Sequence, residues 1–165
     1  MTTAVRSRGA AMSAWGAVVA TVFMLVAMSA APAAVDNLAA KQQAVEAMVK
    51  RVQEKFKQDG LAATIEAVND KSTAEFHDKD LYAFIYEDGV CLANGARPAL
   101  VGKNLISLKD QDGKYLIQDM LAIANGPGRG WLTYKWPSPV TNKIEDRGAY
   151  IEKMGIYFIG VGYDR

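Results

Sequence analysis

The sequence has very few of the residues on which catalytic and metal sites depend. Its 165 residues include one cysteine, Cys91, and one histidine, His77. A single thiol cannot form an internal disulfide, and one cysteine with one histidine does not make up a zinc ligand set. No G-x-S-x-G motif is present to expose a nucleophilic serine. We therefore expect no enzymatic activity, no metal site and no cofactor.

An excess of charge of one sign is also lacking. The chain has 19 lysines and arginines against 18 acidic residues, a net charge of +1, and no block of like charges. Arg6 and Arg8 precede the first acidic residue, Asp36, so the chain without its start has 19 − 2 = 17 basic and 18 acidic residues. Nucleic-acid-binding proteins gain most of their affinity by neutralising phosphates. Nucleic acid is therefore not an expected partner.

Residues 1–33 have the pattern of a signal peptide. Two arginines precede an uncharged apolar run over 14–30, and the small residues in 31–33 fit an A-x-A cleavage pattern. An uncleaved membrane anchor is the alternative, because the run approaches the roughly 18 apolar residues of a spanning helix. We expect cleavage after Ala33, which leaves one exported domain over 34–165 in the periplasm or outside the cell.

Apolar spacing predicts helices first. In the segment 36–60, apolar residues recur at three- and four-residue steps, which is typical of an amphipathic helix. Asp36 can cap its start and Gly60 can end it. The segment 61–70 predicts a second, shorter helix. The residues of the long apolar stripe are Leu38, Val45, Met48, Val49, Val52 and Phe56.

From Asp80 onward the pattern is that of strands. Two runs joined by Asp-Gly predict a β-hairpin, and three further runs follow a helical segment over 114–125. Helices followed by strands indicate an α+β fold with an antiparallel sheet. The predicted strands cover 81–86, 90–93, 131–136, 148–154 and 156–163.

The strand 131-WLTYKW-136 carries bulky aromatic residues on both faces. Because strand residues alternate between faces, Tyr134 and Trp136 share one side, whereas Trp131 and Lys135 share the other. Tyrosine and tryptophan combine a flat apolar body with one polar group, which suits a small pocket over a sheet. Simple packing under the long helix is the alternative. The spacing alone leaves both interpretations open.

Four segments together resemble the Cache family of extracytoplasmic sensor domains, in its small, stand-alone single-Cache form. Their order, with P-x-L-V-G-K-N before Y-x-W-P-x-P, is more specific than either motif alone. The resemblance implies a PAS-like, five-stranded antiparallel sheet, with the long N-terminal helix packed on one face and a ligand pocket on the other. The segments are 80-DLYAFIYEDGVCLAN-94, 98-PALVGKNLISLKDQDGKYLIQDM-120, 130-GWLTYKWPSPVTNKIE-145 and 156-IYFIGVGYD-164.

The resemblance further implies a small organic acid, such as a short carboxylate, bound by aromatic and basic side chains. Arg147, three residues before Tyr150, stands where similar sequences often carry a lysine ahead of a tyrosine, and it could form a bidentate pair with a carboxylate. Asn94 stands where a histidine is expected. Lys135 and Arg97 are rival anchors. The predicted ligand-binding residues are Tyr82, Asn94, Tyr134, Trp136, Arg147 and Tyr150.

These observations predict an exported, non-catalytic sensor that binds a small organic acid and reports to a membrane receptor or transporter. The alternative is a structural module in which the pocket is degenerate and the long helix forms a homodimer. A hydrolase has the least support, because no acid–base pair is recognisable.

Overall fold

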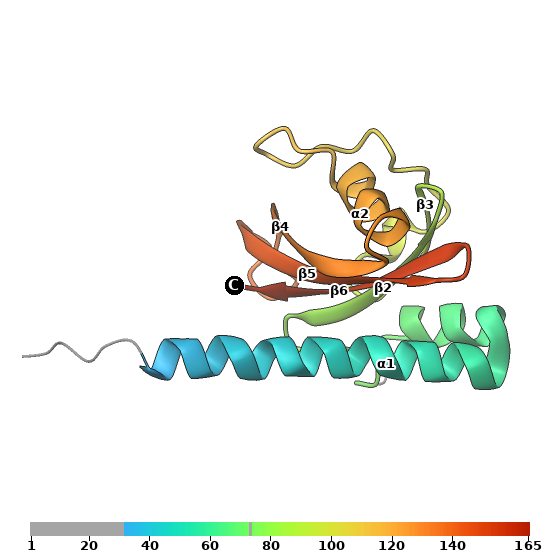
Figure 1. Ribbon diagram of the computed structural model, residues 1–165, viewed down its shortest axis with the longest axis horizontal. Helices are drawn as coiled ribbons and strands as arrows, with labels where there is room; N and C mark the ends of the chain where they lie inside the picture. The colour runs from blue at the N-terminus through green and yellow to red at the C-terminus, as the bar shows by residue number, and fades with distance from the viewer. Residues whose placement is uncertain (1–31, 73) are drawn as a thin grey trace, which may run out of the picture. The chain divides into compact units, whose positions relative to one another are not determined.

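The structure is a computed structural model that describes residues 32–72 and 74–165 (Figure 1). The predicted signal peptide lies outside the described residues except for its last two positions. Its cleavage after Ala33 therefore stays a prediction. Within the described part of the chain, no helix is both long and apolar enough to cross a membrane.

The long helix α1 spans Pro32–Asn69 and is kinked at Gly60. Gly60 has φ 77° and ψ 179°, a backbone conformation that residues with a side chain rarely adopt. The kink lies where the sequence predicted the end of one helix and the start of the next. The predicted apolar stripe is buried at Val45, Met48, Val49 and Val52, whereas Leu38 is exposed.

The strands form one antiparallel sheet in the order β1-β2-β6-β5-β4, with β3 paired to β2. The predicted α+β class and antiparallel sheet are confirmed. The sheet has six strands where five were predicted, because the two-residue β1 is too short to leave an alternating pattern. The strands are β1 (His77–Asp78), β2 (Leu81–Glu87), β3 (Val90–Asn94), β4 (Arg129–Pro137), β5 (Ile144–Met154) and β6 (Tyr157–Asp164).

The sheet is covered on both faces (Figure 1). Helix α1 lies against one side, which we call the helix face. Helix α2 (Leu116–Asn125), a short 3-10 helix (Pro98–Leu100) and the loops around them lie against the other, which we call the pocket face. Each face has its own apolar core, and the tyrosines and phenylalanines of β2 point mainly to the pocket face.

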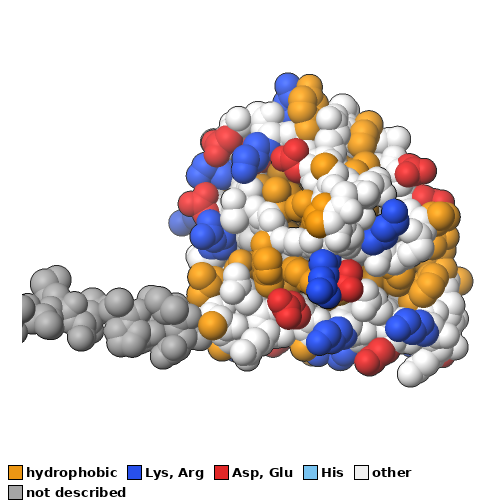
Figure 2. Space-filling model, viewed as in Figure 1, with side chains coloured by type: hydrophobic (Ala, Val, Ile, Leu, Met, Phe, Trp, Pro, Cys, Tyr) orange, Lys and Arg blue, Asp and Glu red, His pale blue; other side chains and the backbone are white. Residues whose placement is uncertain are grey.

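Charged side chains are interspersed over the surface in the view of Figure 2, where lysines and arginines alternate with acidic residues. This distribution agrees with the near-zero net charge of the sequence. It presents no broad electropositive surface on this side of the molecule.

Candidate functional site

A cavity lies between the pocket face of the sheet and α2. It contains about 330 Å³ of space between atoms, part of it open to solvent. The sheet supplies its aromatic and polar lining, while α2 and the preceding loop supply aliphatic side chains. The lining residues are Tyr82, Phe84, Tyr86, Asn94, Leu100, Leu108, Leu116, Ile117, Met120, Tyr134 and Trp136.

Two glycines of β6 make room for the floor of this cavity. In the sheet register Tyr82 lies opposite Gly162, and Phe84 lies opposite Gly160. A Cβ atom on Gly160 would come within 2.2 Å of the Phe84 ring. A Cβ atom on Gly162 would lie 3.2 Å from Tyr134 Oη and 3.3 Å from Tyr82 Cζ. The hydroxyl ends of both tyrosines therefore meet over the same glycine.

The space inside is small. The centre of a water molecule can occupy about 30 Å³ of the cavity, whereas a single buried water needs about 10–15 Å³ measured in this way. The cavity therefore fits two or three waters, or an organic molecule with only a few heavy atoms.

The two tyrosines that meet over Gly162 are both buried. Tyr82 is 4% exposed and Tyr134 is 6% exposed. Burial raises the pKa of both hydroxyls, and the positive charge of Arg147 opposes this rise only in part. Both hydroxyls therefore keep their protons at neutral pH and can each donate a hydrogen bond.

Asn94 adds a third polar group with a fixed orientation. Its Oδ1 accepts hydrogen bonds from the backbone N–H groups of Ala96 at 3.1 Å and Arg97 at 2.8 Å. Because these contacts hold the oxygen, the side-chain NH₂ group is the one left to donate. That group has no hydrogen-bond partner among the residues that the structure describes.

Arg147 is fully buried, on β5, and lies behind the tyrosines without lining the cavity. Its Nη1 pairs with Asp164 Oδ1, and its Nη2 donates to the carbonyl oxygen of Asp80 at 2.9 Å. Its guanidinium carbon lies 5.1 Å from the centre of the Tyr82 ring. The predicted bidentate fork is therefore occupied by protein groups, and Arg147 places a positive charge next to the tyrosine end of the cavity.

Arg147 Nε is buried and has no hydrogen-bond partner within the described part of the chain. A buried donor without a partner is uncommon and costs free energy. The guanidinium thus keeps one unused N–H group close to the cavity.

Tyr150 is not brought to this site. Arg147 and Tyr150 are separated by three positions, so alternation along β5 sends their side chains to opposite faces. Tyr150 belongs to the core of the helix face, where its ring lies 4.8 Å from that of Trp131. The expected place of Tyr150 in the ligand site is therefore corrected: its side chain lies on the face of the sheet opposite the cavity.

The rival anchors are also engaged elsewhere. Lys135 Nζ pairs with Asp146 Oδ1 at 2.8 Å, away from Tyr134 and Trp136 as alternation predicts. Arg97 Nη2 lies 3.4 Å from both Pro137 O and Asn142 Oδ1. Neither side chain lines the cavity.

The predicted site residues included neither the individual side chains of the aliphatic wall nor Asp164. The wall residues Leu116, Ile117 and Met120 stand in the predicted helical stripe of 114–125, so their shared face was a usable signal. Asp164 follows the last predicted strand, and nothing in its surroundings along the chain indicates a buried arginine partner. Over residues 32–72 and 74–165, no group of three or more His, Cys, Asp or Glu side chains is placed to hold a metal ion.

Comparison with characterised proteins gives two relatives over about half of the chain. The sensor histidine kinase MctS of Rhizobium johnstonii is 31% identical over 87 residues, and the methyl-accepting chemotaxis protein McpP of Pseudomonas putida is 29% identical over 89 residues. Each match covers 52% of this chain but only 19% and 16% of the respective relatives. The matched segment thus spans less than a fifth of either relative's length.

Solved structures share the fold. A methyl-accepting chemotaxis protein from Vibrio parahaemolyticus superposes with a TM-score of 0.64 at 24% identity, covering 79% of this chain and 92% of that one. A periplasmic sensor domain of a chemotaxis protein gives 0.64 at 19% identity, over 81% and 99% of the two chains. A third structure, described as showing carboxylic acid recognition by a Cache chemosensory domain, gives 0.61 at 18% identity, over 79% and 97%.

The family comparison extends over the whole described domain. The Cache domain family matches residues 31–165, which include both faces of the sheet and all residues of the cavity. The resemblance noted from the sequence is confirmed, and this chain belongs to the Cache domain family.

Proposed function

We propose that this protein is an exported, non-catalytic sensor domain that binds a short-chain carboxylic acid in the cavity between β2, β4 and α2. The observation that carries the proposal is the pair of buried tyrosine hydroxyls meeting over Gly162 with a buried guanidinium behind them. The proposed ligand-contacting residues are Tyr82, Asn94, Tyr134 and Trp136, and Arg147 supplies positive charge from behind.

The chemistry of the lining favours an anion with a short apolar tail. A buried carboxylate needs hydrogen-bond donors and a compensating charge, because an unpaired buried charge is very costly. Two phenolic hydroxyls and the Asn94 amide supply donors, and Arg147 supplies the charge. The tail would then contact Phe84, Met120 and the other apolar side chains of the lining.

The size of the cavity limits both the ligand and its affinity. An acid such as propionate has about five heavy atoms, and at a ceiling of about −1.5 kcal/mol per atom its binding free energy reaches about −7.5 kcal/mol. This corresponds to a dissociation constant in the micromolar range at best. Such affinity suits a reversible sensor. The two relatives are a sensor histidine kinase and a methyl-accepting chemotaxis protein, which supports a sensory function and a membrane receptor as partner.

The experiment is isothermal titration calorimetry with straight-chain acids of two to six carbons, each paired with its neutral amide. We expect heat from acids of about two to four carbons, weaker binding of the longer ones because the cavity is small, and no binding of the amides. Failure of every acid to bind, or equal binding of an acid and its amide, would contradict the proposal.

A further inference from the structure

We propose that a chain of hydrogen bonds from Arg147 through Asp164 and Asp80 to Lys41 couples the guanidinium behind the pocket to the N-terminal part of α1. The inference builds on the proposed function, since it names how occupancy of the pocket would reach the opposite layer of the protein. It concerns residues outside the cavity lining, on β6, on the segment before β2, and on α1.

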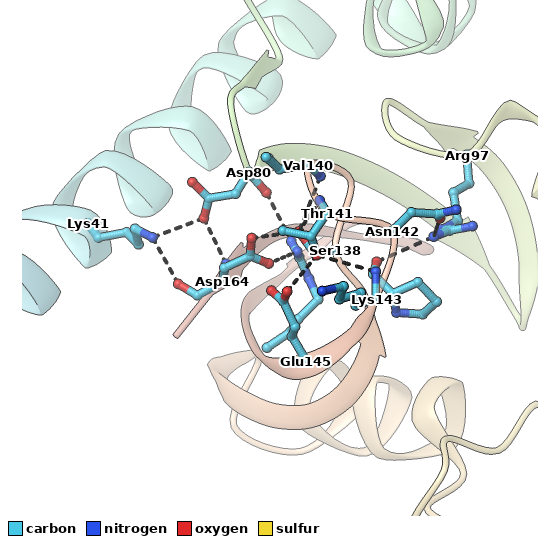
Figure 3. Close-up of polar contacts among 12 residues, drawn as sticks. Lys41, Asp80, Arg97, Ser138, Val140, Thr141, Asn142, Lys143, Glu145 and Asp164 are labelled. Carbon is cyan, nitrogen blue, oxygen red and sulfur yellow. Dashed lines mark hydrogen bonds and ion pairs between the residues drawn. The ribbon is translucent and has the colours of Figure 1, made fainter.

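The contacts run past the C-terminal end of β6 to α1 (Figure 3). The Asp164 carboxylate pairs with Arg147. The backbone N–H of Asp164 donates to Asp80 Oδ2 at 2.8 Å. Lys41 Nζ donates to the same Asp80 Oδ2 at 3.0 Å and to the carbonyl oxygen of Asp164 at 2.9 Å. Asp80 Oδ2 therefore accepts hydrogen bonds from both Asp164 and Lys41. A shift of Asp164 would move its own carbonyl oxygen and Asp80 Oδ2, which are the two acceptors for Lys41 Nζ.

Arg147 and the two carboxylates are sheltered from water, which strengthens their interactions, whereas the Lys41 side chain is 29% exposed. The Arg147 side chain is fully buried, and the side chains of Asp80 and Asp164 are 14% and 21% exposed. Two cations and two carboxylates balance in charge. Because the protein balances them already, a further anion next to Arg147 must draw on a charge that Asp164 now uses.

Both partners of the Arg147–Asp164 pair have an alternative hydrogen-bonding group within the network. Asp164 Oδ2 accepts a hydrogen bond from the buried Ser138 Oγ at 2.8 Å, so the carboxylate keeps a partner if its contact with Arg147 weakens. Arg147 in turn has the unused Nε donor. A carboxylate at the Tyr82 and Tyr134 hydroxyls would compete with Asp164 for the guanidinium, and the resulting displacement would loosen Asp80 and Lys41.

The expected output is a change at the first described turns of α1. Lys41 lies near this end of the helix, and a shallow hollow there is lined by Asn37, Leu38, Lys41, Asp164 and Arg165. Residues 164–165 and this part of α1 therefore line one hollow at the Lys41 end of the network. A partner that contacts this end would sense the change without touching the cavity.

The test uses nuclear magnetic resonance on the full chain without ligand, comparing wild type with Lys41→Gln and Lys55→Gln. The observable is the solvent exchange rate of the Arg147 Nε–H group. Lys55 is the matched control because its Nζ pairs with Asp59 Oδ2 at 2.8 Å on the same helix but outside the network. We expect Lys41→Gln to raise the exchange rate at least about fivefold, because coupling between two sites of a protein commonly changes an equilibrium by about fivefold or more. Lys55→Gln should change the rate by less than about twofold.

Equal effects of the two variants, or no effect of either, would overturn the inference. A second measurement follows backbone amide shifts of residues 38–42 in wild type during titration with sodium propionate. Movement of these amides together with those of β4 supports the coupling, whereas movement of β4 alone overturns it. If propionate does not bind while Lys41→Gln still accelerates exchange at Arg147, the proposed ligand class fails and the coupling stands.

Discussion

Tyr134 and Tyr150 are both buried tyrosines on neighbouring strands, and they project from opposite faces of the sheet. A phenolic hydroxyl that donates to a carboxylate contributes about 1.5–3 kcal/mol. We therefore expect Tyr134→Phe to weaken binding of propionate about 10- to 100-fold by calorimetry. Tyr150→Phe is the control, since it removes a hydroxyl on the helix face. Equal loss in both variants would show that the cavity is not the binding site.

Gly160 makes room for the Phe84 ring. An added methyl group would overlap this ring and come within 2.8 Å of Ile151 Cδ1, and both neighbours are packed in the core. We expect Gly160→Ala to lower the free energy of unfolding by about 1–3 kcal/mol in urea titrations, as overpacking of a core does. At Gly162 the nearest contact is 3.2 Å, so Gly162→Ala should cost less. The reverse order would contradict the packing described for the cavity floor.

The face of the sheet to which a side chain points was predictable from alternation within its own strand. Alternation placed Tyr134 and Trp136 together and separated them from Lys135, and the structure has this arrangement. The face of Tyr150 differs from the expectation, because a three-residue step along a strand reverses the side-chain direction and the family pattern carries no information on the face. The partners of Arg147 were not predictable, since Asp80 and Asp164 lie 67 and 17 positions away along the chain.

At the level of secondary-structure elements, the side chain of Asp110 joins the loop before α2 to strand β4 by hydrogen bonds. Its Oδ1 accepts from the backbone of Asp112 and Lys114, both at 2.9 Å, and its Oδ2 accepts from Lys135 N–H at 3.1 Å. Burial alone would raise the pKa of Asp110, but these backbone hydrogen bonds outweigh it and the pKa is lowered. The carboxylate therefore stabilises the fold above its ordinary pKa, and this contribution is lost as the pH falls through the lowered value.

We expect Asp110→Asn to lower the free energy of unfolding by about 1–3 kcal/mol at neutral pH, because the amide nitrogen cannot accept from the Lys135 N–H group. Urea titration measures the change. Asp112→Asn is the control, since Asp112 is exposed, and it should alter stability by less than about 0.5 kcal/mol. The Asp110 variant should also lose less stability than wild type in acid. An unchanged urea midpoint at neutral pH would mean that the loop is held by other contacts.

The elements themselves were largely predictable. The helical stripe of α1, its interruption at Gly60 and the Asp-Gly hairpin all follow from local spacing and turn chemistry. The two-residue β1 was missed because it pairs with β2 through tertiary contacts and has no periodic pattern of its own. The cavity was expected over the sheet, but its depth depends on how α2 packs, which no local pattern specifies.

At the scale of the whole molecule, one sheet separates two apolar cores, and several tyrosines are buried in them. Burial raises the pKa of Tyr82, Tyr86, Tyr134 and Tyr150. A tyrosine with a raised pKa in the folded state binds its proton more tightly than in the unfolded chain, so stability is full below the unfolded pKa of about 10 and falls above it. We expect the urea midpoint to be flat from about pH 7 to 9 and to drop above about pH 10. A midpoint that is unchanged at about pH 11 would contradict the burial of these hydroxyls.

The proposed sensory function depends on a short carboxylate binding over Gly162, between β2, β4 and α2. A crystal structure of the protein grown with propionate tests it most directly. We predict propionate in this cavity, with its carboxylate within hydrogen-bond distance of Tyr82 Oη and Tyr134 Oη and its ethyl group toward Met120. An empty cavity at saturating propionate, or propionate bound only at surface lysines, would contradict the account.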